Sequence, residues 1–179
     1  RDFSDFCSII YAHHMDVPAM FGDLDRFEKP DYFEEHKYGK IFFDERWWGL
    51  SIFAFSQANA YDNNYYQTSL VGNAAKQAYL QLVKDGAKQF RQLDELGPDD
   101  HIVMLSTCAR GATDARYQVF AKITDTVEAD PWAKTRPVYI VDLFPPWPWW
   151  GIAAFVLLAA AVVLLAWLER RDRPLVVEI

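Results

Sequence analysis

The sequence has 179 residues, of which 51% are hydrophobic and 16% aromatic, and its formal net charge is −7. This length suits one domain with an additional segment. Binding to nucleic-acid phosphates requires a clustered basic surface, and no stretch of this acidic chain supplies one, so we exclude a nucleic-acid partner. The first residue is Arg1 rather than methionine, so we expect an N-terminal piece of the protein to lie outside this sequence.

Short runs of β-branched and aromatic residues, bounded by turn residues, predict the strands of a mostly antiparallel barrel or sandwich. These runs are 7–11, 49–55, 101–108 and 116–123. Between them, apolar residues recur with helical spacing from Asn73, a predicted N-cap, to about Gly86. A shorter helix is expected at 31–37, after Pro30. The sequence therefore predicts a mainly β domain with an inserted helix.

The C-terminal part contains an uncharged stretch of 20 residues at 149–168, WWGIAAFVLLAAAVVLLAWL. A helix of this length crosses about 30 Å of hydrocarbon, and tryptophans near both ends favour a transmembrane helix over a buried globular one. Arg170, Arg171 and Arg173 follow the stretch and predict a cytoplasmic tail at 169–179. The proline- and aromatic-rich residues 128–148 are predicted to form a stiff connector that leaves residues 1–127 outside the cell.

A cysteine and an arginine lie at the two ends of a predicted strand connection in MLSTCARGATDARYQVFAKI. If the flanking strands are antiparallel, Cys108 and Arg116 lie at the same end of the pair, about 5 Å apart. A thiolate near neutral pH requires a base or a positive neighbour, and histidine is the usual partner. His13 and His14 follow the first predicted strand, where they either face Cys108 or are ordinary turn residues. The other two histidines lie in a charged helical stretch and at a turn.

The other cysteine, Cys7, alternates along the first strand onto the same face as Ile9 and Tyr11. This pattern favours a thiol in the core over a disulfide with Cys108, since a domain of this size does not need one. The spacing of the two cysteines matches no metal motif. We therefore expect no metal site.

Several segments follow one another in a characteristic order over roughly residues 3–123. They are IIYAHHMDVPAMFGDLDRF, EKPDYFEEHKYGKIFF, the long helix, MLSTC and DARYQVFAKI. In this combination the chain resembles class B sortases, the membrane-bound cysteine transpeptidases of Gram-positive bacteria. The resemblance implies an eight-stranded sortase-type β-barrel with a helix inserted between late strands, here beginning near Asn73. It also implies that the first strands and N-terminal helices of that fold are missing from the domain at 1–127.

The resemblance assigns roles to residues by position. His13 corresponds to the catalytic histidine of the family, Cys108 to its nucleophile and Arg116 to its arginine. The positions that contact the sorting peptide in class B enzymes correspond to Tyr11, Tyr65, Tyr66, Ser106 and Thr107. The resemblance implies no cofactor.

A few positions depart from the family pattern. Ala12 replaces the glycine usual before the histidine, which requires either a negative φ or some strain. Met104 replaces the first threonine of the cysteine motif, and residues 109–111 follow Cys108 where a polar residue is common. The change after Cys108 is expected to alter peptide preference, whereas no departure removes a catalytic group.

The implied activity is the cleavage of a C-terminal sorting motif through a thioester on Cys108, followed by transfer of the acyl group to an amine. The implied partners are surface proteins with sorting signals or pilins, an amine of the peptidoglycan precursor or of a pilin, and the lipid bilayer. A C-terminal membrane span is similar to that of pilus-building sortases. The alternative is a catalytically inert, membrane-tethered β-barrel that acts as a binding module.

Overall fold

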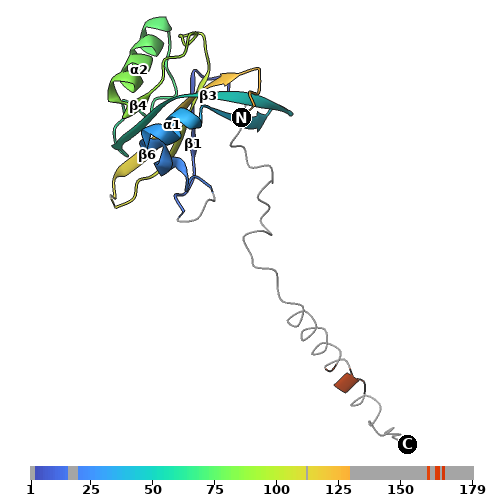
Figure 1. Cartoon of the computed structure of the whole chain (residues 1–179). Helices are drawn as coiled ribbons and strands as arrows, with labels where there is room; N and C mark the ends of the chain where they lie inside the picture. The colour runs from blue at the N-terminus through green and yellow to red at the C-terminus, as the bar shows by residue number, and fades with distance from the viewer. Residues whose placement is uncertain are drawn as a thin grey trace, which may run out of the picture. The chain divides into compact units, whose positions relative to one another are not determined.

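The structure is a computed structural model that describes residues 3–15, 20–111 and 113–129, together with Ala161, Leu164, Leu165 and Trp167. The chain divides into two compact units, Arg1–Ala133 and Lys134–Ile179. The first unit contains all the labelled strands and helices of Figure 1.

The predicted membrane span at 149–168 lies outside the described residues except for four positions, which are helical. None of the helices formed by the described residues combines the length and the apolar character that a membrane crossing needs. The predicted tail at 169–179 and nearly all of the connector at 128–148 also lie outside the described residues.

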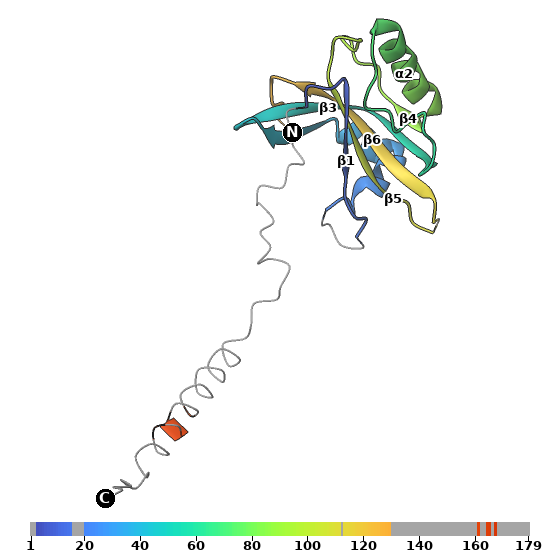
Figure 2. The same ribbon diagram turned by 180° about the vertical axis from the view of Figure 1, so that it is seen from behind.

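A curled six-stranded sheet forms the centre of the first unit, as Figures 1 and 2 show from opposite sides. Its strands are β1 (Cys7–Tyr11), β2 (Tyr38–Phe43), β3 (Arg46–Asn59), β4 (Gln89–Phe90), β5 (Ile102–Cys108) and β6 (Ala115–Thr124). The strand order is β1-β5-β6-β3-β2, and β4 pairs with β3. Only the pair of β1 and β5 is parallel among these strands. The mainly β, mostly antiparallel prediction is confirmed, although the described strands form a half-barrel with β1 and β2 outermost instead of a closed barrel.

Three helices accompany the sheet: the 3-10 helix η1 (Leu24–Glu28), α1 (Pro30–Glu35) and α2 (Asn73–Gly86). Pro30 begins α1, where its missing N–H leaves no hydrogen bond unmade. The expected extension of α1 to residue 37 is wrong, because the helix ends at Glu35 and β2 begins at Tyr38. The predicted cap of α2 is also displaced by one residue. Gly72, with a φ of 84° that favours glycine, occupies the N-cap, and Asn73 is already helical.

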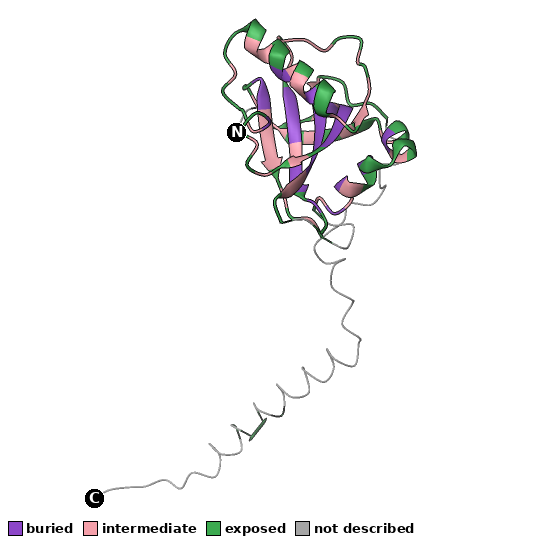
Figure 3. Ribbon diagram, turned by 90° about the vertical axis from the view of Figure 1, so that its left-hand side faces the viewer, coloured by how far each residue is buried: buried purple, intermediate pink, exposed green. Residues whose placement is uncertain are grey.

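Helices cover both faces of the sheet, so successive residues of the central strands are buried on opposite sides. Val103 of β5 packs in one core cluster with Phe33 of α1. Met104, the next residue, packs in a second cluster with Val83 of α2. Figure 3 shows the buried residues concentrated on the central strands with the exposed surfaces of the helices outside. A strand covered on both faces is continuously apolar, which explains the unbroken apolar run in β5.

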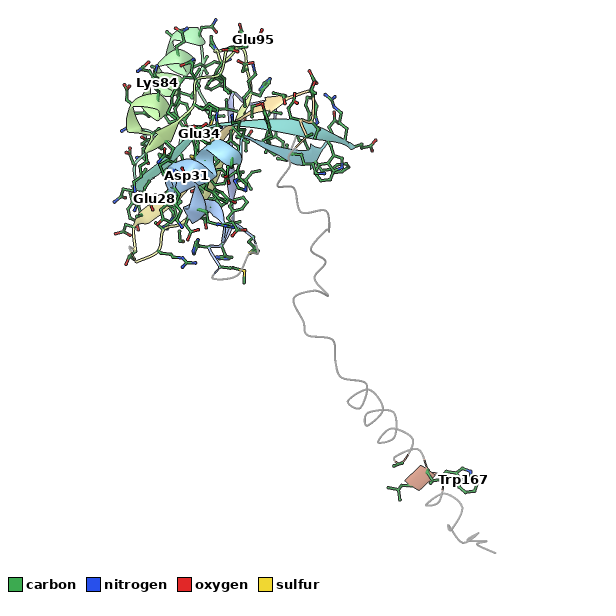
Figure 4. The ribbon with its side chains drawn as sticks, viewed as in Figure 1. Glu28, Asp31, Glu34, Lys84, Glu95 and Trp167 are labelled. Atoms are coloured by element: carbon green, nitrogen blue, oxygen red, sulfur yellow. The ribbon has the colours of Figure 1, made fainter. Side chains whose placement is uncertain are left out.

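Polar contacts fasten the small helices to the sheet. Arg91, after β4, donates hydrogen bonds from Nη1 to the Ile52 carbonyl of β3 (2.7 Å) and from Nη2 to the Phe33 carbonyl of α1 (2.5 Å). Lys88 Nζ donates to Glu28 Oε1 of η1 (2.5 Å). Glu28 and Glu34 are labelled in Figure 4 on the side of the sheet that η1 and α1 cover. These contacts hold η1 and α1 against the sheet.

Candidate active site

Three neighbouring strands, β1, β5 and β6, bring the predicted site residues together at one end of the sheet. In the parallel pair, Tyr11 at the end of β1 lies opposite Ser106 of β5. In the antiparallel pair, Cys108 at the end of β5 lies opposite Arg116 near the start of β6. The predicted strand pairing that places Cys108 beside Arg116 is therefore confirmed.

Two hydrogen bonds hold the residue before His13 against β5. The Ala12 amide donates to the Ser106 carbonyl (3.2 Å), and Thr107 Oγ1 donates to the Ala12 carbonyl (2.8 Å). Ala12 is not among the described non-glycine residues with positive φ, so alanine fits here without left-handed strain. His13 therefore leaves an anchored backbone position next to the end of the cysteine strand.

A pocket of about 310 Å³ contains the three residues that the sequence marks as catalytic. It is lined by Tyr11, Ala12, His13, Met20, Ser106, Thr107, Cys108 and Arg116. Cys108 and His13 are exposed, so both side chains are accessible from solvent. Ser106 is buried, and its Oγ has no hydrogen-bond partner among the described residues.

The Arg116 guanidinium is held close to its own strand. Its Nη1 donates to the carbonyl oxygens of Ala115 (2.9 Å) and Thr113 (3.2 Å). A positive group in this place can stabilise negative charge that develops on a carbonyl oxygen attacked by Cys108. The arrangement thus combines an accessible thiol, an imidazole and a fixed cation.

The predicted peptide-contacting tyrosines are divided by the structure. Tyr11 is 64% exposed, and its ring stacks on Tyr66 with centroids 6.2 Å apart. Both rings also line a neighbouring hollow along β1 of about 700 Å³. Tyr65 instead is buried in the core beside Phe120 and does not line the Cys108 pocket. Of the five predicted contacts, Tyr11, Ser106 and Thr107 reach the pocket directly.

The two thiols lie in opposite environments and are not joined in a disulfide. Cys7 is fully buried and donates a hydrogen bond to the Tyr79 hydroxyl (3.5 Å), as predicted for a core thiol. Burial raises the pKa of the Cys7 thiol to about 11. Of these two thiols, only that of Cys108 is exposed to solvent. Within the described ranges, no group of three or more histidine, cysteine, aspartate or glutamate side chains could hold a metal ion.

One group of residues beside the pocket was not predicted as a unit. Arg110 Nε donates to His14 Nε2 (2.8 Å) and lies 3.2 Å from Asp25 Oδ2. The sequence offered His14 either as a residue that faces Cys108 or as a turn residue, and Arg110 only as part of the departure from the family pattern after Cys108. No local pattern pointed to the contact between them.

The half-barrel holds a cysteine, a histidine and an arginine in one pocket at the end of its strands. This combination of fold and site defines a sortase-type cysteine enzyme. Sortase B from the type II pilus of Streptococcus pneumoniae has 41% sequence identity, a TM-score of 0.65 and covers 70% of this chain, which spans 71% of it. The chain therefore belongs to the class B sortase family. No protein-family model and no curated protein matches the chain.

Other solved structures agree with this assignment. Clostridium perfringens sortase B has 26% identity and a TM-score of 0.63, with 68% of this chain and 67% of that chain covered. A Streptococcus pyogenes class B sortase involved in pilus biogenesis has 32% identity and a TM-score of 0.59, with 68% and 65% covered. The match to a Staphylococcus aureus sortase B covers 68% of this chain but only 58% of that longer chain. These homologues imply a cysteine transpeptidase.

Proposed function

We propose that this protein cleaves a C-terminal sorting motif through a thioester on Cys108 and transfers the acyl group to an amine. The observation that carries the proposal is the pocket shared by Cys108, His13 and Arg116. An exposed thiol, an acid-base group and a cation in one pocket are the groups that acyl transfer requires.

In the first half-reaction, the Cys108 thiol transfers its proton to His13, and the thiolate Sγ attacks the carbonyl carbon of a threonine in an extended peptide. The carbonyl oxygen becomes negatively charged, and the Arg116 guanidinium stabilises this charge. His13 donates a proton to the leaving amine as the peptide bond breaks. The products are a thioester on Cys108 and a released C-terminal fragment.

In the second half-reaction, an incoming amine attacks the thioester. His13 accepts a proton from this amine, a new amide bond forms, and the Cys108 sulfur leaves. Solved sortase B structures include a substrate complex of the Staphylococcus aureus enzyme and a sortase B complex with triglycine. These complexes support a sorting-signal peptide and an amine as the two substrates.

Two relatives support a role in pilus assembly. The sortase with 41% identity belongs to a pneumococcal type II pilus, and the one with 32% identity is involved in pilus biogenesis. A pilin is then the protein that carries the sorting motif, and a pilin amine is the acceptor. A peptidoglycan-precursor amine is the acceptor if the protein anchors a surface protein instead.

We propose that the helix predicted at 149–168 anchors the protein in the cell membrane, with the catalytic domain on the outer side. Tethering next to emerging pilins or a lipid-linked cell-wall precursor raises the local concentration of the amine. A high local amine concentration favours transfer over hydrolysis of the thioester. The membrane segment is therefore part of the proposed function, and its test is membrane recovery of the full chain compared with a chain ending at residue 129.

The decisive pair of variants replaces each cysteine in turn. Cys108→Ala should abolish cleavage of threonine-containing sorting peptides, whereas Cys7→Ala should retain it, because Cys7 is buried away from the pocket. Cleavage by Cys108→Ala would contradict the proposal. Inactivity of the wild-type protein, together with equally slow labelling of both thiols, would favour an inert binding module.

A further inference from the structure

We infer that Arg110, His14 and Asp25 form a positioning cluster that sets the placement of Cys108 relative to His13. This inference rests on the proposed function, because it concerns the same two reacting groups. The cluster joins three segments: the residues after β1, the helix η1 and the β5–β6 connection. It lies beside the pocket, whose lining does not include these three residues.

The sequence positions of the cluster explain why it acts on the reacting groups. His14 directly follows His13, and Arg110 is two residues after Cys108. Arg110 Nε donates to His14 Nε2 at 2.8 Å, so the bond joins the segment that carries the acid-base group to the segment that carries the nucleophile. Such a cross-connection limits how far the two groups can separate.

Asp25 completes the cluster from a third direction. Its Oδ2 lies 3.2 Å from Arg110 Nε and 3.9 Å from His14 Nε2. The carboxylate compensates the charge of Arg110, and the side chains of His14 and Asp25 are only 10% and 22% exposed. Partial removal of water strengthens these charge-assisted contacts compared with a solvated surface pair.

The hydrogen bond also fixes the role of one ring nitrogen of His14. Because Arg110 donates, His14 Nε2 is the acceptor in this contact. His14 Nδ1 is buried and has no hydrogen-bond partner among the described residues. Arg110 thus supplies the hydrogen bond that orients this ring, which lies near Tyr117 with centroids 6.5 Å apart.

The backbone around the cluster is already fixed on each side. The Phe21 amide donates to the His13 carbonyl (3.3 Å), and the Ala109 amide donates to the Ala115 carbonyl (2.9 Å). Each bond holds one reacting residue within its own segment, but neither joins the two segments. The bond from Arg110 to His14 makes that connection, together with the contacts of Ala12 to β5.

Loss of the cluster should therefore misplace the reacting groups without unfolding the domain. The side chain of Arg110 is 54% exposed, so its ion pair is partly screened and contributes little to global stability. A displacement of about 1 Å between reacting groups can lower a rate roughly 100-fold. We expect Arg110→Ala and His14→Leu to lower kcat by roughly 10-fold or more, with KM changed by less than about twofold.

A conservative variant separates positioning from general packing. His14→Gln keeps an acceptor near the place of Nε2 and should recover most of kcat, whereas His14→Leu should not. The double variant R110A/H14L should be no slower than the slower single variant, because both changes break the same bond. Arg46→Ala is the matched control, since it breaks an exposed ion pair with Asp125 (2.7 Å) far along the sheet.

Methanethiosulfonate labelling of Cys108 gives a second measurement that needs no peptide. Arg110→Ala and His14→Leu should lose the part of the labelling rate that depends on His13, and His14→Gln should retain it. Wild-type kcat and labelling in Arg110→Ala would overturn the inference, as would equal impairment of the glutamine and leucine variants. Retained cleavage by Cys108→Ala would instead contradict the proposed function itself.

Discussion

Cys108 and Arg116 are direct cross-strand partners at the last pair of β5 and β6 before the connection between these strands. Both residues lie on paired backbone and line the same pocket. His13 reaches the same pocket from the segment that follows β1, the parallel neighbour of β5. The sheet therefore carries two of the proposed catalytic groups, and the hydrogen bonds of Ala12 to β5 hold the third next to them.

Replacement of Arg116 tests the proposed stabilisation of the oxyanion. Arg116→Ala should lower kcat/KM by roughly 100-fold or more, since a lost oxyanion donor typically costs about 3 kcal/mol. The kcat/KM of Arg116→Lys should lie between those of the wild type and of Arg116→Ala. An ammonium keeps the charge but cannot reproduce the guanidinium contacts with Ala115 and Thr113. Steady-state kinetics on a sorting peptide measures both, and an alanine variant with near wild-type kcat/KM would exclude this role.

Thiol labelling at pH 8 tests the different environments of the two cysteines. Cys108 is exposed and should react quickly with a methanethiosulfonate, whereas Cys7 should react slowly because burial raises its pKa to about 11. The labelling of Cys108 should slow in His13→Ala if the imidazole helps to form the thiolate. Peptide mapping of the labelled protein identifies the site, and equal rates at both cysteines would contradict the assignment.

The pH dependence of unfolding tests the burial of Cys7. Its pKa rises from an ordinary value of 9.0 to about 11 in the folded protein, so the folded state holds this proton more tightly. The corresponding stability, about 2–3 kcal/mol, is present below pH 9 and is lost as the pH rises from 9 through 11. In urea unfolding, the free energy of unfolding of the wild type should fall more steeply across this pH window than that of Cys7→Ser. Parallel curves would show that Cys7 titrates normally.

The hydrogen bond from Thr107 to Ala12 connects the strand ends that carry the site. Thr107→Val removes the hydroxyl but keeps the shape, and it should lower the free energy of unfolding by about 1 kcal/mol and reduce kcat by displacing His13. Thr107→Ser keeps the donor and is the matched control. If both variants unfold at the same urea concentration and have the same kcat, this bond does not position the site.

Local sequence patterns predicted the elements with strong periodicity. The apolar run of β5 and the helical spacing of α2 specify their elements almost residue by residue. β2 was missed, because its residues alternate between exposed and half-buried positions and include Gly39 and Lys40. The turn that joins β2 to β3 places Asp44 and Glu45 at φ values of 50° and 59°, which no strong turn dipeptide indicated.

The site was predictable to the extent that strand pairing is local. Cys108 and Arg116 are joined by one short connection, so their proximity follows from the sequence. The approach of His13 depends on the parallel pairing of β1 and β5, which no sequence pattern predicted, and only the resemblance to class B sortases assigned His13 to the site. The burial of Tyr65 and the contact of Asp25 with Arg110 depend on tertiary packing between distant segments, and no local pattern encodes them.

The most direct test of the central claim is intact-mass spectrometry of the protein after incubation with a threonine-containing sorting peptide in the absence of an amine. The account predicts a mass increase equal to the N-terminal part of the peptide, located on Cys108, removable by hydroxylamine and absent in Cys108→Ala. An acyl adduct on another residue, or peptide cleavage by Cys108→Ala, would contradict the account.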